Sequence, residues 1–374
     1  MERCGGAIQF KTPVVSEMTW FVFTLICIVG WGIADLFYKK SNQTGDRYSH
    51  LKTTVWVGLM MGTVSMIFTL LTLCKDPLFA FLKRQPLSEW ALSSVSSFLH
   101  FVSAENLFTT KASFFVSAVK YLPASLSYII SMTIGYAGMR YLEVSIISPI
   151  QNASGALSAV SMLIHFALIG RIGSFWDDHG AMDTVGTILI ITGVITLGIV
   201  EHRLADAEEV MKIPKAERKY RFGALALIFP VLYCVFDTVG TAADGIILGA
   251  SHGLGLGKID VIILYGFTFL LAGFLSWTFL LFREKKAYNP FCRGEIKTRG
   301  VAALFEQFGQ IFYVYAMADN PVIAAPMIAS YCIVSTILSR IFLKEKMTGS
   351  QYACIAAVFA GVLLLGISEG LSEV

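Results

Sequence analysis

Charged residues are scarce in this sequence of 374 residues. Lysine, arginine, aspartate and glutamate make up 15% of it, whereas the average globular protein has about 25%. Hydrophobic residues make up 55%, and the mean hydropathy is +0.67. The net charge is only +3, and the basic residues lie between long apolar runs, which argues against a nucleic-acid-binding protein. An ordinary soluble domain is therefore excluded.

The sequence also lacks the motifs of several other protein classes. Its seven cysteines show no paired spacing, and several lie inside apolar runs, so neither a disulfide framework nor a zinc site is indicated. It has no HExxH motif and no paired acidic metal motif. The first apolar run has no small-residue cleavage site, and we expect a retained span rather than a signal peptide. We predict no metal, no cofactor and no catalytic residues.

What the sequence does have is ten long apolar stretches. A helix needs about 20 apolar residues to cross a bilayer, and each stretch comes close to that length. They predict an all-α polytopic protein that crosses the lipid bilayer ten times. The stretches are 18–38, 53–73, 121–142, 146–169, 183–200, 222–240, 261–282, 300–318, 321–343 and 349–367.

The fifth and tenth stretches have nearly the same sequence. GVITLGIVE at 193–201 and GVLLLGISE at 361–369 share six of nine residues. We therefore divide the chain into two five-helix repeats, 1–200 and 222–374, joined by a charged linker at 201–221. Because five is an odd number, the second repeat must enter the membrane in the opposite sense, as in many secondary transporters.

Further pairs follow when the prolines of the two repeats are aligned and when WGIAD at 31–35 is aligned with YCVFD at 233–237. The prolines of the fourth and ninth spans correspond, and each can free a backbone carbonyl in its helix. We predict that these two prolines are hinges or helix breaks. The corresponding pairs are Pro149 with Pro326, Tyr136 with Tyr313, and Asp35 with Asp237.

One segment breaks the symmetry between the repeats. Residues 75–120 separate the second and third spans and have no counterpart of similar length in the second repeat. Within this insert, residues 88–110 contain Glu89, His100 and Glu105, which favour an interfacial helix over an eleventh span. Lysine and arginine are enriched in the loops on one side, and this bias places both termini outside the cytoplasm.

Three stretches carry a resemblance to a known family. WGIADLFYKK in the first span, SPIQNASGAL in the fourth, and the segment from APMIASYC to GVLLLG resemble ten-span proteins of the drug/metabolite transporter superfamily with two EamA-type repeats. Pro326, Glu345 and Gly361 match the repeat pattern, whereas the first repeat lacks the glutamate expected after its fourth span. The resemblance implies a secondary transporter of a small organic solute, with both termini in the cytoplasm, against the charge bias.

Ionisable residues inside the spans are the first candidates for function. A charged group in the middle of a membrane costs roughly 2.5–3.5 kcal/mol on insertion scales, so it usually faces a cavity. Glu306 is the deepest acid, and Gln310 and Tyr313 follow it at i+4 and i+7 on the same helix face. A purely structural hydrogen bond to another helix is the alternative. Asp35 and Asp237 lie near predicted span ends, where the structural interpretation is favoured.

The fourth span adds further candidates. Gln151 and Asn152 directly follow its proline, and we expect them to line the cavity together with Tyr136 of the third span. Serines at 154, 158 and 161 continue one polar face with His165, and this face fits helix packing and cavity lining equally well.

These patterns predict a transporter, not an enzyme, that works by alternating access in the plasma membrane. Either a proton exchanged at Glu306 or the solute gradient alone would drive it. A multispan enzyme acting on lipid-linked substrates, and an ion or divalent-cation channel, remain alternatives, and the sequence leaves a homodimer open.

Overall fold

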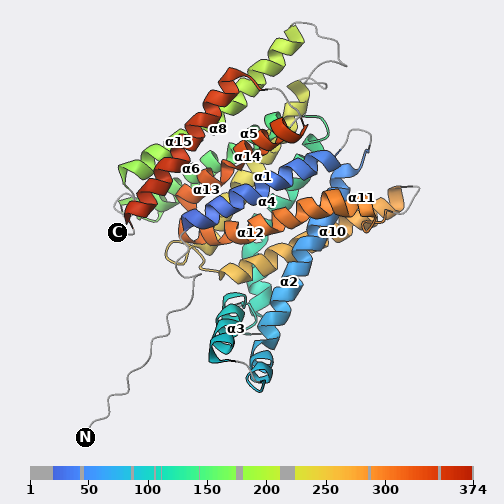
Figure 1. Cartoon of the computed structure of the whole chain (residues 1–374), viewed down its shortest axis with the longest axis vertical. Helices are drawn as coiled ribbons and strands as arrows, with labels where there is room; N and C mark the ends of the chain where they lie inside the picture. Colours follow the sequence, from blue (N-terminus) through green and yellow to red (C-terminus); the bar gives the residue numbers. More distant parts are fainter. Residues whose placement is uncertain are drawn as a thin grey trace.

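The computed structural model describes residues 20–42, 46–85, 88–104, 107–110, 112–142, 144–173, 180–210, 224–284, 288–343 and 347–372. All regular structure in these residues is helical (Figure 1). The helices are α1 (Trp20–Ser41), α2 (Ser49–Leu82), α3 (Glu89–Phe101), α4 (Ser113–Gly138), α5 (Val144–Asn152), α6 (Ser154–Leu168), α8 (Ala181–Val210), η2 (Ala224–Leu227), α9 (Ile228–Leu248), α10 (Lys258–Arg283), α11 (Arg293–Glu295), η3 (Ile296–Gly300), α12 (Val301–Asp319), α13 (Pro321–Ala329), α14 (Tyr331–Leu338), η4 (Ser339–Leu343) and α15 (Gly349–Ser372).

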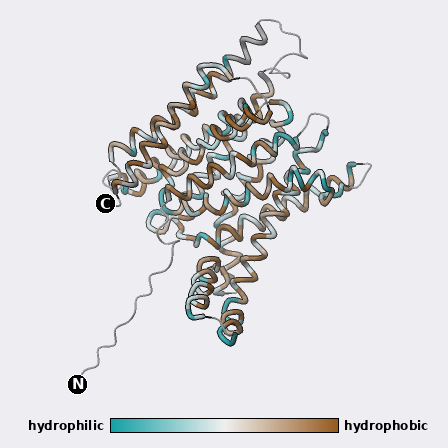
Figure 2. The backbone as a smooth tube through the Cα atoms, in the orientation of Figure 1, coloured by the Kyte–Doolittle hydropathy of each residue, from teal (hydrophilic) through white to brown (hydrophobic). Residues whose placement is uncertain are grey.

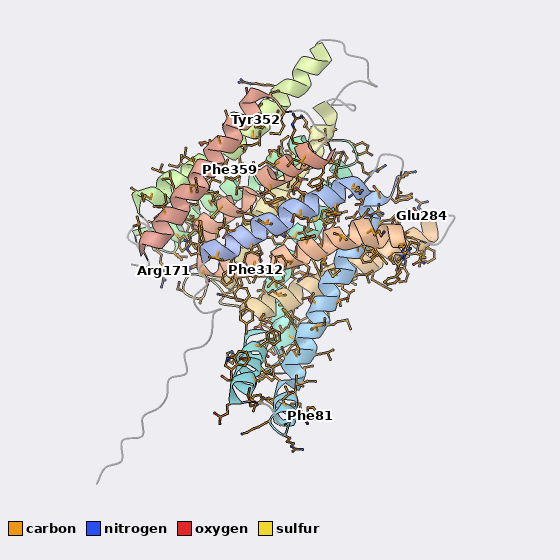
Figure 3. All side chains as sticks on the ribbon, in the orientation of Figure 1. Phe81, Arg171, Glu284, Phe312, Tyr352 and Phe359 are labelled. Carbon is orange, nitrogen blue, oxygen red and sulfur yellow. The ribbon has the colours of Figure 1, made fainter. Side chains whose placement is uncertain are left out.

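The hydrophobic residues run along the helices, and the hydrophilic ones gather at their ends (Figure 2). Eight of the described helical segments are long and apolar enough to cross a membrane, so this is an integral membrane protein. Helix α12 and the pair α5–α6 are the other two predicted spans and do not meet that criterion. Both carry polar residues predicted to function, which lowers their hydropathy. Many bulky apolar side chains, such as Phe359 in Figure 3, are exposed on the outer surface, as expected of a surface that faces lipid.

Helices from the two halves of the chain are packed in pairs. Under the predicted alignment, α2 packs on its counterpart α10 and α8 on its counterpart α15, and the fourth span packs on the ninth through α6 and α13. Two other large contacts join α1 with α12 and α4 with α9. Because α1 corresponds to α9 and α4 to α12, these two contacts are equivalent to each other. This set of pairs is what a two-fold axis would produce.

The paired helices run antiparallel. On α2, a Cβ at Gly58 would meet Phe269 and Gly273, whereas Ser65 seven residues later donates to the carbonyl of Ile262, which lies earlier on α10. The same holds for α8 and α15, where Gly186 meets Gly361 and Gly193 meets Val358. Each of these helices therefore runs in the opposite direction to its counterpart.

Close backbone approach explains several of the glycines. A Cβ at Gly58 would lie 2.4 Å from the carbonyl oxygen of Phe269, and one at Gly361 would lie 2.7 Å from that of Gly186. Residues without a side chain let membrane helices approach in this way. The repeated sequences GVITLGIVE and GVLLLGISE thus lie at the contact between α8 and α15.

The fourth and ninth spans are interrupted, but not at their prolines. The structure places Pro149 inside α5 and Pro326 inside α13, and the helices end three residues later, at Asn152 and Ala329. Ala153 and Ser330 separate the two parts of each span. These two positions correspond under the same alignment that pairs the prolines.

Two predicted boundaries differ from the structure. Helix α8 continues to Val210, so the first ten residues of the predicted linker are helical, whereas 211–223 lie outside the described residues. Helix α2 continues past residue 73 to Leu82, through Lys75, Asp76 and Pro77. The insert is a short hairpin in which the 13-residue α3 packs beside the end of α2 (Figure 1). Thirteen helical residues span about 20 Å, which is too short to cross a bilayer.

Candidate functional site

A cavity lies between the two halves, and every residue predicted to bind solute lines it. It leaves about 60 Å³ to the centres of water-sized molecules, which is room for a few waters. Its walls come from α1, α4, α5, α6, α9, α10, α12, α13 and α14. The predicted residues that line it are Asp35, Tyr136, Gln151, Asn152, Asp237, Glu306, Gln310 and Tyr313.

The two aspartates are held by serines of the interrupted helices. Ser148 of α5 and Ser335 of α14 both donate to Oδ2 of Asp35, at 2.8 Å and 2.7 Å. Ser154 of α6 donates to Oδ2 of Asp237 at 2.6 Å. Both aspartates were predicted near the ends of their spans, and for Asp237 this prediction is wrong. Helix α9 runs from 228 to 248, so Asp237 lies at its middle, and Asp35 is 6% exposed.

Glu306 faces the same cavity from α12. Asp35 and Asp237 are close enough to act on its charge, and Cys27 of α1 lies beside it. Its side chain makes no hydrogen bond or ion pair with the described residues, unlike the two aspartates. The arginines nearest in sequence to the spans do not reach it: Arg140, for example, donates to the carbonyl of Arg47 at the membrane boundary.

Three amides complete the polar wall. Asn152 donates to the carbonyl of Ser148 at 2.7 Å and is therefore satisfied within its helix. Gln151 and Gln310 are each 2% exposed, and the side-chain nitrogen of each has no hydrogen-bond partner among the described residues. A buried amide without a partner is costly, so these two groups are free to bind a ligand or water.

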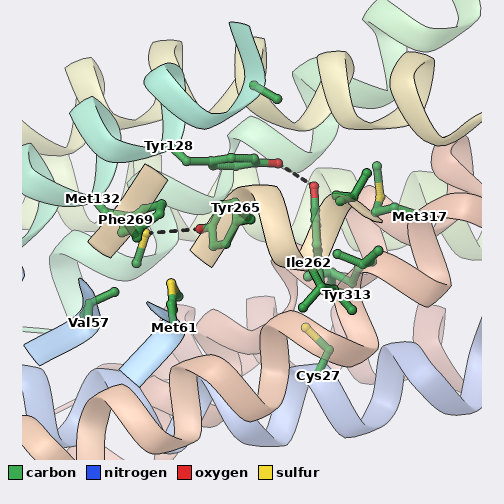
Figure 4. Close-up of a cluster of buried hydrophobic side chains, with 14 of the residues drawn as sticks. Cys27, Val57, Met61, Tyr128, Met132, Ile262, Tyr265, Phe269, Tyr313 and Met317 are labelled. Atoms are coloured by element: carbon green, nitrogen blue, oxygen red, sulfur yellow. Dashed lines mark hydrogen bonds between the residues drawn. The ribbon is translucent and has the colours of Figure 1, made fainter. Parts of the chain in front are cut away.

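Aromatic side chains form the rest of the wall, and of these the sequence singled out only Tyr136 and Tyr313. Seven tyrosines and Trp31 line the cavity. Trp31 stacks on Tyr313 with ring centroids 5.2 Å apart and meets Tyr331 edge-on at 5.6 Å. Tyr128 and Tyr313 share a hydrogen bond across the cavity (Figure 4). A tyrosine in an apolar span is normally interpreted as a core residue. No sequence signal distinguishes a tyrosine that packs in the core from one that lines a cavity.

Asp244 is a fourth buried acid, on α9 two turns beyond Asp237. It is 0% exposed, and its carboxylate faces the hydroxyls of Tyr121, Tyr128 and Tyr313. The sixth span was predicted to end at residue 240, which left Asp244 outside it. The longer α9 brings this acid next to one end of the cavity.

A buried ion pair lies beyond the other end of the cavity. Arg299 is 4% exposed and donates to Glu295, to the carbonyl of Ser41 at 2.7 Å and to Thr53 at 3.2 Å. These contacts join η3 to the end of α1 and the start of α2. The guanidinium is therefore engaged outside the cavity.

The polar face of the fourth span contacts α9. Ser158 donates to the carbonyl of Thr238, and His165 contacts the carbonyl of His252 just after α9. Ser154 is the member that also lines the cavity, so the face serves mainly in helix packing.

Residues 246–367 match the EamA-like transporter family. This match supports the suspected kinship with the drug/metabolite transporter superfamily. Glu345 of the family pattern lies outside the described residues. One solved crystal structure is 13% identical, covers 94% of this chain and 98% of its own, and superposes with a TM-score of 0.52. It shares the fold, and the fold match extends over both halves. No curated protein sequence matches significantly.

Proposed function

We propose that the protein is a secondary transporter that moves a small organic solute across the plasma membrane by alternating access. The observation that carries this proposal is the cavity between the two halves, which collects acids, amides and tyrosines from both. An EamA-like domain in the second half supports membrane transport of this type.

The fold proposal is a ten-helix transporter of two inverted five-helix repeats. Antiparallel packing of two counterpart pairs, α2–α10 and α8–α15, supports the inversion. Interruptions at Ala153 and Ser330 support the repeat, because they fall at corresponding positions. The two halves rock about the cavity, and the interrupted helices carry the serines that hold the aspartates.

Glu306 is the proposed coupling residue. A carboxylate without a counter-charge is costly inside a membrane protein, so it is neutralised by a proton or by a cation from solution. The other titratable groups around the cavity are Asp35, Asp237, Asp244 and the buried tyrosines, and Cys27 lies beside Glu306. Only Glu306 among the three acids that line the cavity lacks a hydrogen bond to hold its charged form.

Transport in reconstituted vesicles tests the proposal. Purified protein in liposomes with an imposed pH gradient is given a mixture of labelled small metabolites, and uptake and proton flux are followed together. Solute-dependent proton flux that requires the protein is expected. Ion current without solute would favour a channel, and chemical conversion of a lipid-linked substrate would favour an enzyme; either outcome would overturn the proposal.

A further inference from the structure

The charges that line the cavity are all of one sign. Asp35, Asp237 and Glu306 line it, and it has no lysine, arginine or histidine among its lining residues. The buried bases nearby are engaged elsewhere: Arg299 binds Glu295, and Lys39 donates to the carbonyls of Met139 and Leu142. An anionic ligand would meet repulsion on every side and no compensating charge.

The aromatic wall has the chemistry that favours cations. The face of an aromatic ring attracts ammonium groups within about 6 Å of its centroid, and more strongly where water is excluded. Trp31, Tyr313 and Tyr331 form one contiguous aromatic surface, with centroid distances of 5.2 Å and 5.6 Å. This surface and the three acids face the same space.

Two unpartnered amides provide a second, independent sign of a ligand. The side-chain nitrogens of Gln151 and Gln310 are buried without a hydrogen-bond partner among the described residues, and both side chains line the cavity. Amide donors of this kind bind a hydroxyl, ether or carbonyl oxygen. The complementary ligand therefore has a cationic end and an uncharged oxygen.

We infer that the solute is a small organic cation, a protonated or quaternary amine that carries a neutral hydrogen-bond acceptor. This inference rests on the proposed function, since it assigns the substrate class of the same cavity. The acids bind the ammonium, the aromatic surface covers its alkyl groups, and the amides of Gln151 and Gln310 orient the oxygen.

A set of ligands with one common body and different charges tests the substrate class. 2-Phenoxyethylamine is cationic at neutral pH and carries an ether oxygen, 2-phenoxyethanol is a neutral alcohol, phenoxyacetate is anionic and O-phenylserine is zwitterionic. Thermal stabilisation of the purified wild-type protein by each ligand reports binding without requiring transport. We expect stabilisation by the amine at concentrations at least about tenfold lower than by the others, which corresponds to about 1.4 kcal/mol. Equal or stronger stabilisation by the anion or the neutral alcohol would overturn the inference.

Variants locate the binding on the cavity. Glu306→Gln is expected to weaken amine binding at least about tenfold, whereas Asp319→Asn, on the same helix but in an exposed ion pair with Lys258, is expected to leave it unchanged. Tyr331→Leu is expected to weaken binding about tenfold, and Tyr331→Phe is expected to retain most of it because the ring is kept. Equal losses in Tyr331→Phe and Tyr331→Leu would contradict the aromatic contribution.

Binding and transport separate the two proposals. If the amine binds but no solute is transported in vesicles, the proposed function fails and the ligand class stands. If vesicles transport an anionic or neutral solute and the amine does not bind, the ligand class fails and the transporter stands.

Discussion

The two halves of the protein share their scaffold but not their charges. Asp35 and Asp237 correspond, and each accepts a hydrogen bond from a serine of an interrupted helix. The interruptions at Ala153 and Ser330 correspond as well. The serine-bound aspartate and the interrupted helix thus occur in both halves.

Several charged residues have no charged counterpart in the other half. Under the alignment that pairs the prolines, Glu306 corresponds to Ile129, and Arg299 corresponds to Leu122. Asp244 corresponds to Asn42 when the aspartates are aligned. The repeated features form the fold, and the unmatched ones give each end of the cavity its own chemistry: an ion pair at one end and tyrosines around Asp244 at the other.

Removing the charge of Glu306, which has no counterpart in the first half, should have the largest effect on transport. We expect Glu306→Gln to abolish proton-coupled transport while the protein folds and inserts normally, because the amide keeps the shape and removes the charge. The measurement is uptake in vesicles with and without a pH gradient, with Asp319→Asn as the matched control on α12. A Glu306→Gln variant that transports with an unchanged pH dependence would remove Glu306 from coupling.

The matched acids should respond alike. We expect Asp35→Asn and Asp237→Asn each to lower transport, and by amounts within about tenfold of each other, or 1.4 kcal/mol. The reason is that both side chains occupy corresponding sites and accept serine hydroxyls, a bond that asparagine still allows. Initial rates of uptake, normalised to inserted protein, give the comparison. A loss confined to one of the two variants would show that the halves are not equivalent at the aspartates.

The next effect concerns stability rather than transport. Gly58→Ala should destabilise the protein by about 1–3 kcal/mol because the added Cβ overpacks the α2–α10 contact, where it would lie 2.4 Å from the carbonyl oxygen of Phe269. Gly294→Ala is the control, since nothing lies within 4 Å of its added Cβ. Thermal unfolding in detergent compares the two variants. Equal melting temperatures would mean that α2 and α10 are not held at this distance.

Buried acids and amides could be predicted from the sequence because their cost in a membrane marks them individually. Glu306 and Gln151 are examples, and the cavity that contains them follows from their shared need for polar surroundings. Tyr136 and Tyr313 were predicted, but the other tyrosines could not be recognised, since Tyr265 in a cavity and a tyrosine in a core have the same apolar neighbours in sequence. Asp244 was missed for a different reason: the apolar pattern weakens before α9 ends, so the helix was predicted too short.

The fold shows the same division between local and long-range information. Hydrophobic length predicted where most helices lie, and the repeated phrase predicted which helices correspond. The positions of the breaks could not be derived, because Pro149 and Pro326 are accommodated within their helices and the chain departs from the helix four residues later. Packing against the other half decides that position, and such contacts are not encoded in a single segment.

The smallest expected effect lies in the connection between α9 and α10, which differs from the short connection between α1 and α2. Partial burial lowers the pKa of His252 from its ordinary value of 6.5, and the nearby His165 and Arg171 act in the same direction. The ring lies against Phe166, with centroids 4.8 Å apart. Because the folded state favours the neutral ring, its contribution to stability is present above pH 6.5 and is lost as the pH falls below that value.

We expect the melting temperature to fall slightly between neutral and mildly acidic pH, and His252→Gln to remove that part of the fall. His100→Gln, at an exposed position on α3, is the control and should leave the profile unchanged. An identical pH profile in wild type and His252→Gln would show that this connection does not sense protons.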